Sequence, residues 1–145
     1  NIPKEEYTIP IGKADVKIEG QDVTLVTYGL MLHHCVEAAR ILKEENVAVE
    51  VIDLRTLRPI DQDTVIRSVV KTGRALIVHE DTLALGIGAE ISAILSEHVF
   101  DSLDAPIKRL AGPEVPAMPF SPTLESQFMI NTEQIVKALK ELTEY

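Results

Sequence analysis

The residues of this sequence best suited to chemistry are a histidine and two carboxylates in a row, His79, Glu80 and Asp81. A histidine next to a carboxylate can act as a general base with an acid that orients it. Consecutive residues of a strand point to opposite faces, so His79 and Glu80 are not expected to share one substrate. The pattern supplies no nucleophile to complete a triad. We therefore favour a structural or interface role for His79 and Glu80 over catalysis.

A second group of charged residues follows another apolar run. Asp53, Arg55 and Arg58 could hold an anionic ligand, because arginine binds carboxylates and phosphates with two parallel hydrogen bonds. The alternative is an ion-pair network in which the arginines meet Asp53, Glu80 or Asp81 at neighbouring strand ends. In an acidic chain we favour the ion-pair network.

A glycine pair at 86–88 opens an expected helix after a strand, which is where phosphate-binding loops occur. The dinucleotide fingerprint needs a third glycine, but Ile91 occupies that position. The acidic residues Glu80, Asp81 and Glu90 would also repel phosphate. A tight turn that lets a helix approach a strand closely is the favoured interpretation of Gly86–Gly88.

No histidine, cysteine or carboxylate spacing in the sequence resembles a metal site. His33 and His34 lie at an expected helix start, and His98 lies near a helix end. Cys35 falls on an apolar helix face and is expected to be inert. As the single cysteine it permits no internal disulfide, which suits a reducing cytosol. We predict no catalytic, cofactor-binding or metal-binding residue.

Short apolar runs alternate with amphipathic segments along the chain. The spacing predicts strands over 14–18, 22–28, 47–52, 74–79 and 106–110, and helices over 31–45, 61–71, 86–100 and from 131 onward. Asp61 and Asn131 are expected N-caps, with Gln134 completing a capping box, and Gly73 should end a helix. Residues 111–130 contain four prolines and are expected to be irregular.

This alternation predicts an α/β fold with three layers, a mainly parallel twisted sheet of about five strands with helices on both faces. Ligands of such sheets bind outside the carboxyl ends of the strands, where the charged groups above are expected. We interpret residues 1–21 as a lead-in from a missing N-terminal domain and residues 22–145 as the domain itself. The segment beginning at Asn1 resembles an entry segment from a longer polypeptide.

The charge composition of the chain limits the kinds of partner that it can bind. The 145 residues carry 23 acidic and 14 basic side chains, a net charge of −9, so nucleic acid is an unsuitable partner and a basic protein a suitable one. No apolar run approaches the roughly 20 residues of a membrane span, and these residues show no signal-peptide pattern. A cytoplasmic protein is expected. One alternative is a free-standing nucleotide-binding or anion-binding α/β domain that uses Gly86–Gly88 and Arg55.

A set of ordered motifs resembles one known family. The runs DVTLVTYG, EAARIL, VEVIDLRTLRPID, SVVKTGRALIVHED, GIGAEISA and LDAPIKRLAGPEVP are similar to the C-terminal domain of the beta subunit of thiamine-dependent 2-oxo acid dehydrogenases. Transketolase shares this domain more distantly. The tail EVPAMPFSPTLESQFMINTEQI resembles the bacterial branched-chain (2-oxoisovalerate) type, with pyruvate or acetoin dehydrogenase as alternatives.

The resemblance implies a role in branched-chain amino acid catabolism. The holoenzyme is an oxidoreductase that decarboxylates a 2-oxo acid on thiamine diphosphate and transfers the acyl group to a lipoyl group. Thiamine diphosphate and magnesium would lie outside this domain, so the fragment should be inactive alone. The implied partners are the alpha subunit, a second beta subunit in an α2β2 heterotetramer, and the peripheral subunit-binding domain of the dihydrolipoyl acyltransferase.

The resemblance also implies where these partners would bind. The docking surface for the acyltransferase would use Asp104 in the LDAP turn and the C-terminal region that ends at Tyr145. The strand-end residues are expected at interfaces with a neighbouring domain or subunit: Asp53, Arg55, Arg58, His79 and Glu80.

Overall fold

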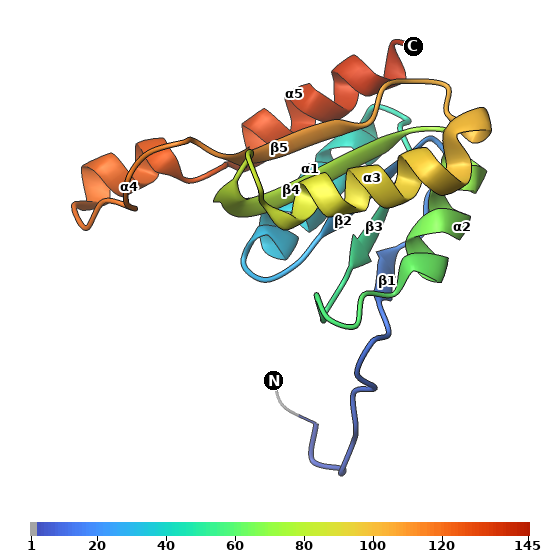
Figure 1. The fold of residues 1–145 in the computed structure, drawn as a ribbon, viewed down its shortest axis with the longest axis horizontal. Coiled ribbons are helices and arrows are strands. Elements are labelled where there is room, and N and C mark those ends of the chain that lie inside the picture. Colours follow the sequence, from blue (N-terminus) through green and yellow to red (C-terminus); the bar gives the residue numbers. More distant parts are fainter. Residues whose placement is uncertain (1–2) are drawn as a thin grey trace.

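Within residues 3–145, the part of the chain that the computed structural model describes, five strands form one twisted sheet (Figure 1). The strands are β1 (Asp15–Ile18), β2 (Val23–Thr27), β3 (Val49–Asp53), β4 (Ala75–Thr82) and β5 (Lys108–Gly112). Their order is β1-β3-β2-β4-β5, with β1 antiparallel to β3 and every other neighbouring pair parallel. The predicted mainly parallel α/β sheet is confirmed.

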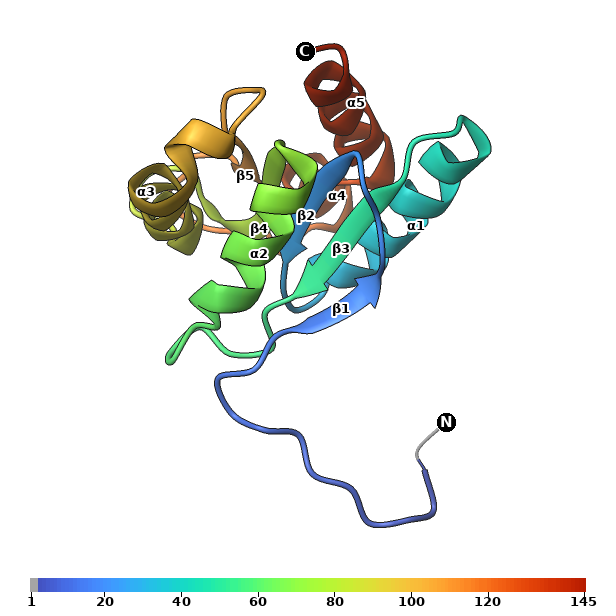
Figure 2. The same ribbon diagram turned by 90° about the vertical axis from the view of Figure 1, so that its right-hand side faces the viewer.

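Helices cover both faces of the sheet (Figure 2). They are α1 (Met31–Glu44), α2 (Gln62–Thr72), α3 (Ile87–Val99), α4 (Pro122–Phe128) and α5 (Thr132–Thr143), and a short 3-10 turn, Phe100–Ser102, follows α3. Helices α1 and α5 pack together on one face, and α2 and α3 pack on the other. The predicted three layers are therefore present.

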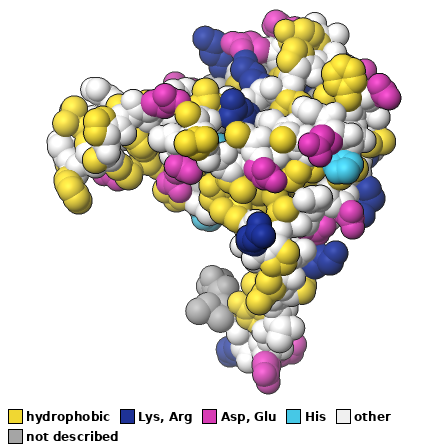
Figure 3. All heavy atoms as spheres, viewed as in Figure 1, with side chains coloured by type: hydrophobic (Ala, Val, Ile, Leu, Met, Phe, Trp, Pro, Cys, Tyr) yellow, Lys and Arg dark blue, Asp and Glu magenta, His cyan; other side chains and the backbone are white. Residues whose placement is uncertain are grey.

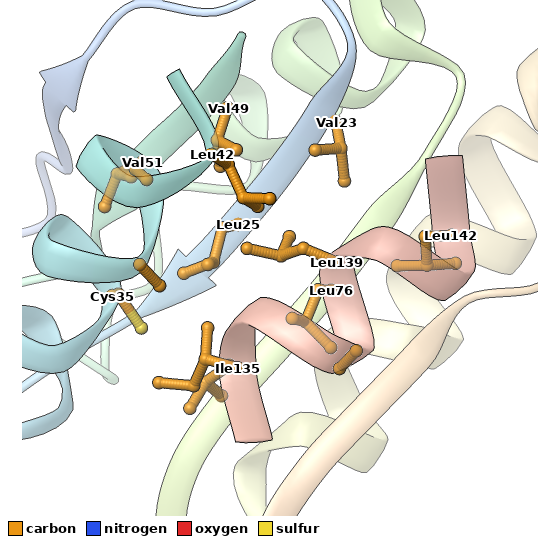
Figure 4. Close-up of a cluster of buried hydrophobic side chains, with 14 of the residues drawn as sticks. Val23, Leu25, Cys35, Leu42, Val49, Val51, Leu76, Ile135, Leu139 and Leu142 are labelled. Carbon is orange, nitrogen blue, oxygen red and sulfur yellow. The ribbon is translucent and has the colours of Figure 1, made fainter. Parts of the chain in front are cut away.

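The larger core cluster lies between the sheet and the pair α1 and α5 (Figure 4). Leu25 of β2 and Leu76 of β4 meet Leu42 of α1 and Leu139 of α5, and all four are fully buried. Burying one such side chain contributes about 1.5–3 kcal/mol. Cys35 lies in the same cluster, and burial raises the pKa of its thiol to about 12, so it stays protonated as expected of a core cysteine.

The predicted helix boundaries are confirmed by their caps. The Asp61 carboxylate accepts a hydrogen bond from the Thr64 backbone N–H at 3.3 Å, and Gly73 ends α2 with a φ of 69°. At the start of α5, the Asn131 and Gln134 side chains each accept the other's backbone N–H at 2.9 Å. These polar groups satisfy backbone N–H donors that the first helical turn leaves free.

Two expectations about element boundaries are wrong. Strand β4 was expected to end at His79, but it continues to Thr82 through a bulge, so Glu80 and Asp81 belong to the strand. The segment 111–130 was expected to be irregular, but it contains α4. Pro122 is the first residue of that helix, a position where the missing N–H of proline costs nothing.

The N-terminal lead-in contributes only its second half to the sheet, where β1 pairs along one edge. Residues 3–13 extend away from the body (Figure 1). The first two residues of the expected lead-in, Asn1 and Ile2, lie outside the described residues. Of the helices described, none is both long and apolar enough to span a bilayer.

Candidate functional site

The carboxyl end of β4 places His79 in the interior. Its side chain is fully buried, and its ring stacks on that of Tyr28, the residue after β2, with centroids 6.5 Å apart and planes 12° apart. The bulge between His79 and Thr82 interrupts the regular pairing of β4 with β5 directly after the histidine. Glu80 is partly buried, whereas Asp81 is exposed. The three residues do not form one accessible cluster.

The glycines at the start of α3 make room for the histidine ring. A Cβ atom on Gly86 would lie 2.8 Å from Cε1 of His79, and a Cβ on Gly88 would overlap its Nε2 atom. This close approach of helix to strand supports the tight-turn interpretation of Gly86–Gly88. The glycine pair thus serves to pack the histidine ring against the start of α3.

Neither ring nitrogen of His79 has a hydrogen-bond partner among the residues that the structure describes. Burial lowers the pKa of the imidazole, opposed by the negative charge of Asp81. The ring is therefore uncharged near neutral pH. A general base must reach the proton that it abstracts, and a fully enclosed ring cannot do so.

The charged residues after β3 pair differently from the expected network. The Arg55 guanidinium forms an ion pair with Asp15 of β1, rather than with Glu80 or Asp81 of β4. Its backbone N–H donates to Oδ1 of Asp53 at 3.1 Å. The correction has a topological cause, because β1 adds beside β3 at the edge, whereas β2 separates β3 from β4. Arg55 thus ties the edge strand to the sheet.

Arg58 lies three residues after Arg55 in the same loop and is exposed. Among the ion pairs found in residues 3–145, none includes Arg58. Its guanidinium is available to another molecule.

Asp104 and Tyr145 line the same open cavity, although they are far apart in sequence. Its volume is about 660 Å³. Asp104 precedes β5, and Tyr145 follows α5; the two side chains are 63% and 70% exposed. Eight further residues line this cavity and were not predicted as site residues from the sequence: Ser92, Ser96, Phe100, Leu103, Ala105, Pro106, Ile107 and Arg109. The exposed aromatic Phe100, just beyond α3, was the available signal for them.

The backbone of Asp104 is held against the end of α2. Its N–H donates to the Gly73 carbonyl oxygen at 2.8 Å, and a Cβ on Gly73 would lie 2.8 Å from Cγ of Asp104. Oδ2 of Asp104 lies 3.9 Å from Nη1 of Arg74, a long contact between side chains that water reaches. Such an exposed pair contributes little stability, so the carboxylate can exchange it for a cation on a partner.

A neighbouring cavity of about 510 Å³ runs between β5 and α5. Tyr145 lines this cavity as well, together with Glu144 and an ion pair between Lys108 and Glu141. The hydrogen bond from Lys108 lowers the pKa of Glu141, so its carboxylate is ionised at neutral pH. Tyr145 therefore lines both cavities: the smaller one has two acids and one base, and the larger one has one acid, Asp104, and one base, Arg109.

A third surface is apolar. Residues 113–130, which we call the arm, project from the body (Figure 1). Hydrophobic side chains are visible over the arm and along the lead-in below it (Figure 3). The exposed apolar side chains of the arm are Val115, Met118, Phe120 and Leu124. The arm carries only two charged residues, both acidic, Glu114 and Glu125.

Apolar side chains are also exposed in the loops after the parallel strands. Leu30 follows β2, Leu57 follows β3 and Leu85 follows β4. Carboxyl ends of parallel strands share one edge of the sheet, so these leucines lie along that edge. Among residues 3–145, no group of three or more metal-ligating side chains comes together there or elsewhere.

Comparison with known proteins agrees with this architecture. Residues 12–135 match the family described as transketolase, C-terminal domain. The chain is 49% identical over 144 residues to the 2-oxoisovalerate dehydrogenase subunit beta of Bacillus subtilis, covering 99% of this chain and 44% of that protein.

Two further relatives extend the comparison. The chain is 49% identical over 140 residues to the mitochondrial pyruvate dehydrogenase E1 component subunit beta of Dictyostelium discoideum, covering 97% of this chain and 39% of that protein. A solved structure described as a split gene transketolase, inactive beta4 tetramer, superposes with a TM-score of 0.81 at 27% identity, covering 96% of this chain and 44% of that one. The chain thus spans less than half the length of these relatives. It belongs to the transketolase C-terminal domain family.

Proposed function

We propose that the chain is the assembly and docking domain of the beta subunit of a branched-chain 2-oxo acid dehydrogenase. The observation that carries the proposal is the common cavity of Asp104 and Tyr145, two residues that the resemblance alone had paired. Family membership and the named beta subunits among the relatives support it. In this role the domain performs no chemistry of its own.

The chemistry of the cavity fits a small basic partner. Asp104 supplies an anchored carboxylate, Tyr145 and Phe100 supply exposed aromatic surface, and Glu144 adds negative charge beyond Tyr145. Aromatic anchors beside a fixed charge are the usual centre of a binding site. We propose that the peripheral subunit-binding domain of the dihydrolipoyl acyltransferase binds here, with a cation of that domain displacing Arg74 from Asp104.

Replacing Asp104 with Lys tests this docking site. We expect binding of the purified peripheral subunit-binding domain to weaken by about 2 kcal/mol or more, because the swap sets two cations against each other. Binding by the unaltered chain should also weaken as salt rises. Isothermal titration calorimetry at two ionic strengths gives both results.

Glu44→Lys is the matched control for this experiment. It makes the same change of charge at the end of α1, where a cation suits the helix dipole, and Glu44 lines neither cavity. We expect it to bind nearly as the unaltered chain does. Equal losses of affinity in both variants would show that binding depends on the net charge of the chain rather than on Asp104. Unchanged binding by Asp104→Lys would show that the partner does not dock at this site.

We further propose that the arm and the carboxyl edge of the sheet contact other subunits. Phe120 and Leu85 are fully exposed, which is an unfavourable position for large apolar side chains in an isolated chain. One solved relative is described as a beta4 tetramer, so copies of that chain associate with one another. A second beta subunit and an alpha subunit, in an α2β2 heterotetramer, are the proposed partners.

Thiamine diphosphate and magnesium belong to the proposed holoenzyme but not to this domain. The packing of the His79 ring against Gly86 and Gly88 supports this part of the proposal, because the glycines already accommodate a side chain. Saturable nucleotide or thiamine diphosphate binding by this chain alone, measured by calorimetry, would instead favour the free-standing anion-binding alternative. We expect no binding heat for either compound.

The substrate type rests on the resemblance of the tail, residues 114–135. The bacterial branched-chain relative and the Dictyostelium pyruvate relative are both 49% identical to the chain, so overall identity does not separate the two types. We propose the branched-chain type, in the cytoplasm. Decarboxylation assays of the assembled enzyme with 2-oxoisovalerate and with pyruvate decide between them, and a preference for pyruvate would overturn the assignment.

A further inference from the structure

We propose that His79 is a proton-sensitive latch for residues 82–86, the segment that joins β4 to α3. With an uncharged ring, the segment stays closed over the histidine. With a protonated ring, the segment opens while the core of the sheet stays folded. This inference does not depend on the proposed docking or assembly role.

The His79 ring is enclosed without a hydrogen-bond partner for either nitrogen within residues 3–145, which is the first observation behind the latch. His79 is fully buried, and both of its ring nitrogens lack a hydrogen-bond partner among the described residues. Buried polar groups in native proteins are nearly always paired, and an unpaired one costs about 1–3 kcal/mol. Gly86 and Gly88 approach the ring so closely that neither could carry a side chain without a shift. The fold therefore maintains a costly arrangement in order to enclose this imidazole.

The groups around the ring make its protonation unfavourable while the segment is closed. The positive end of the α3 dipole lies against the ring at Gly86 and Gly88, and Arg109 of β5 adds a second positive charge. Asp81 on β4 is the charge that favours protonation. Burial outweighs Asp81, and the pKa of His79 is lowered from its usual value of 6.5.

The remaining titratable neighbours do not neutralise an imidazolium. Tyr28, directly after β2, faces the ring and is uncharged at neutral pH, and burial and the nearby Asp81 raise its pKa further. Glu80 is the other acid of β4, and Glu90, in the first turn of α3, is exposed to water. Protonation would thus place a charge inside the closed structure, where the carboxylate and the backbone of Asp81 are the groups that favour it.

The segment that covers the ring is held weakly. Beyond the pairing of Thr82, the last residue of β4, with Gly112 of β5, two side-chain hydrogen bonds tie the segment to other parts of the chain. They run from the Arg109 Nη1 atom to the Leu83 carbonyl at 2.8 Å and from the Ala84 N–H to Oε1 of Glu114 at 3.2 Å. Both bonds are exposed to solvent. Leu85 adopts a φ of 60°, a strained value for leucine, and buries none of its side chain. Segments of this kind open locally before the protein unfolds.

The pH range follows from linkage. The closed state carries a lowered histidine pKa, and the open state restores a value near 6.5. The closed state is therefore most stable relative to the open state above pH 6.5, and this stability decreases as the pH falls below 6.5. Between pH 7.5 and pH 5.5 the population of the open segment should rise, by at most about tenfold, the limit set by protonation of the open state.

Hydrogen exchange measured by mass spectrometry on the full chain tests the latch. We expect exchange of the amides in 82–88, corrected for the intrinsic rate at each pH, to rise several-fold, and by at most about tenfold, between pH 7.5 and pH 5.5. Amides of β2 and β4 should not change. In His79→Gln, which cannot be protonated, the rise should be absent, and in the control His98→Gln, at the exposed far end of α3, it should persist.

Two results would overturn the latch. One is a rise in exchange that survives in His79→Gln. The other is an NMR titration of the His79 ring in the unaltered chain with an ordinary midpoint near 6.5 and no accompanying change in the amides of 82–88. Because this measurement needs no variant, it applies even if His79→Gln does not fold. A midpoint well below 6.5, together with faster exchange at pH 5.5, supports the proposal.

Discussion

At the scale of single residues, Gly88 packs directly against the His79 ring, so the direction in which an added methyl group changes the unfolding free energy can be predicted. Alanine normally stabilises a helix relative to glycine by about 1 kcal/mol. At Gly88, however, the new Cβ would overlap Nε2 of an enclosed ring. We expect Gly88→Ala to cost about 1–3 kcal/mol of unfolding free energy, measured by urea denaturation, because a packed site must shift.

A double-mutant cycle isolates this contact. In a His79→Ala background the ring is gone, so Gly88→Ala should become neutral or stabilising, by up to about 1 kcal/mol. If Gly88→Ala were equally harmful in both backgrounds, the glycine would be needed for its backbone conformation rather than for the histidine.

Asp61 performs two tasks with one carboxylate, since it caps α2 and holds the segment leading into β1. It accepts hydrogen bonds from the Thr64 N–H at 3.3 Å and from the Ala14 N–H at 3.0 Å. Burial acts to raise its pKa, but these hydrogen bonds outweigh burial, and the pKa lies below the usual 3.8. Asp61→Ala should cost about 1–2 kcal/mol at pH 7.

The pH dependence of that loss has a definite sign. A carboxyl group with a lowered pKa in the folded state stabilises the protein above its unfolded pKa, and the stabilisation is lost as the pH falls. The difference in unfolding free energy between the unaltered chain and Asp61→Ala should therefore be constant above about pH 5 and shrink below 3.8. A difference that stays constant down to pH 2.5 would show that the charge of Asp61 does not contribute.

At the scale of elements, the sequence predicts what depends on local pattern and misses what depends on a neighbour. Apolar periodicity and capping residues located α1, α2, α3 and α5 to within one or two residues. The extension of β4 past His79 needed β5 beside it, and no local signal in Glu80 or Asp81 marks a strand. The short helix α4 had a usable signal in Pro122, but the density of prolines before it obscured that signal.

Some features of the candidate site can likewise be predicted from local sequence, and others cannot. The burial of Cys35 and the tightness of the Gly86–Gly88 turn follow from spacing and side-chain type alone. The partner of Arg55 does not, because Asp15 reaches it only through the antiparallel pairing of β1 with β3. The cavity of Asp104 and Tyr145 likewise depends on tertiary packing of α5 beside β5.

The edge strand β1 supplies a prediction at this scale. Asp15 lies directly opposite Asp53 across the β1–β3 pairing, and like charges so placed destabilise a sheet. Arg55 and Lys17 both form ion pairs with Asp15 and offset that repulsion. Arg55→Ala should raise the hydrogen exchange of residues 15–18 several-fold and leave β2 and β4 unchanged. Uniform loss of protection across the sheet would instead assign Arg55 to global stability.

At the scale of the whole molecule, the arm separates what folds this chain from what assembles it. Phe120 is fully exposed, whereas Phe128 in the same arm is partly buried, and its Cζ atom would lie 3.3 Å from a Cβ on Gly112. The two phenylalanines form a matched pair of the same type in one segment. Their substitutions should therefore have opposite effects on folding and on assembly.

We expect Phe120→Ser to leave the urea midpoint unchanged and to weaken self-association of the chain by at least about tenfold, measured by analytical ultracentrifugation, because an apolar anchor is lost from the contact. Phe128→Ser should lower unfolding free energy by about 1–3 kcal/mol, since it removes a packed ring. Self-association that is unaffected by Phe120→Ser would exclude the arm from the contact between beta subunits. The apolar edge formed by Leu30, Leu57 and Leu85 would then be the surface to alter next.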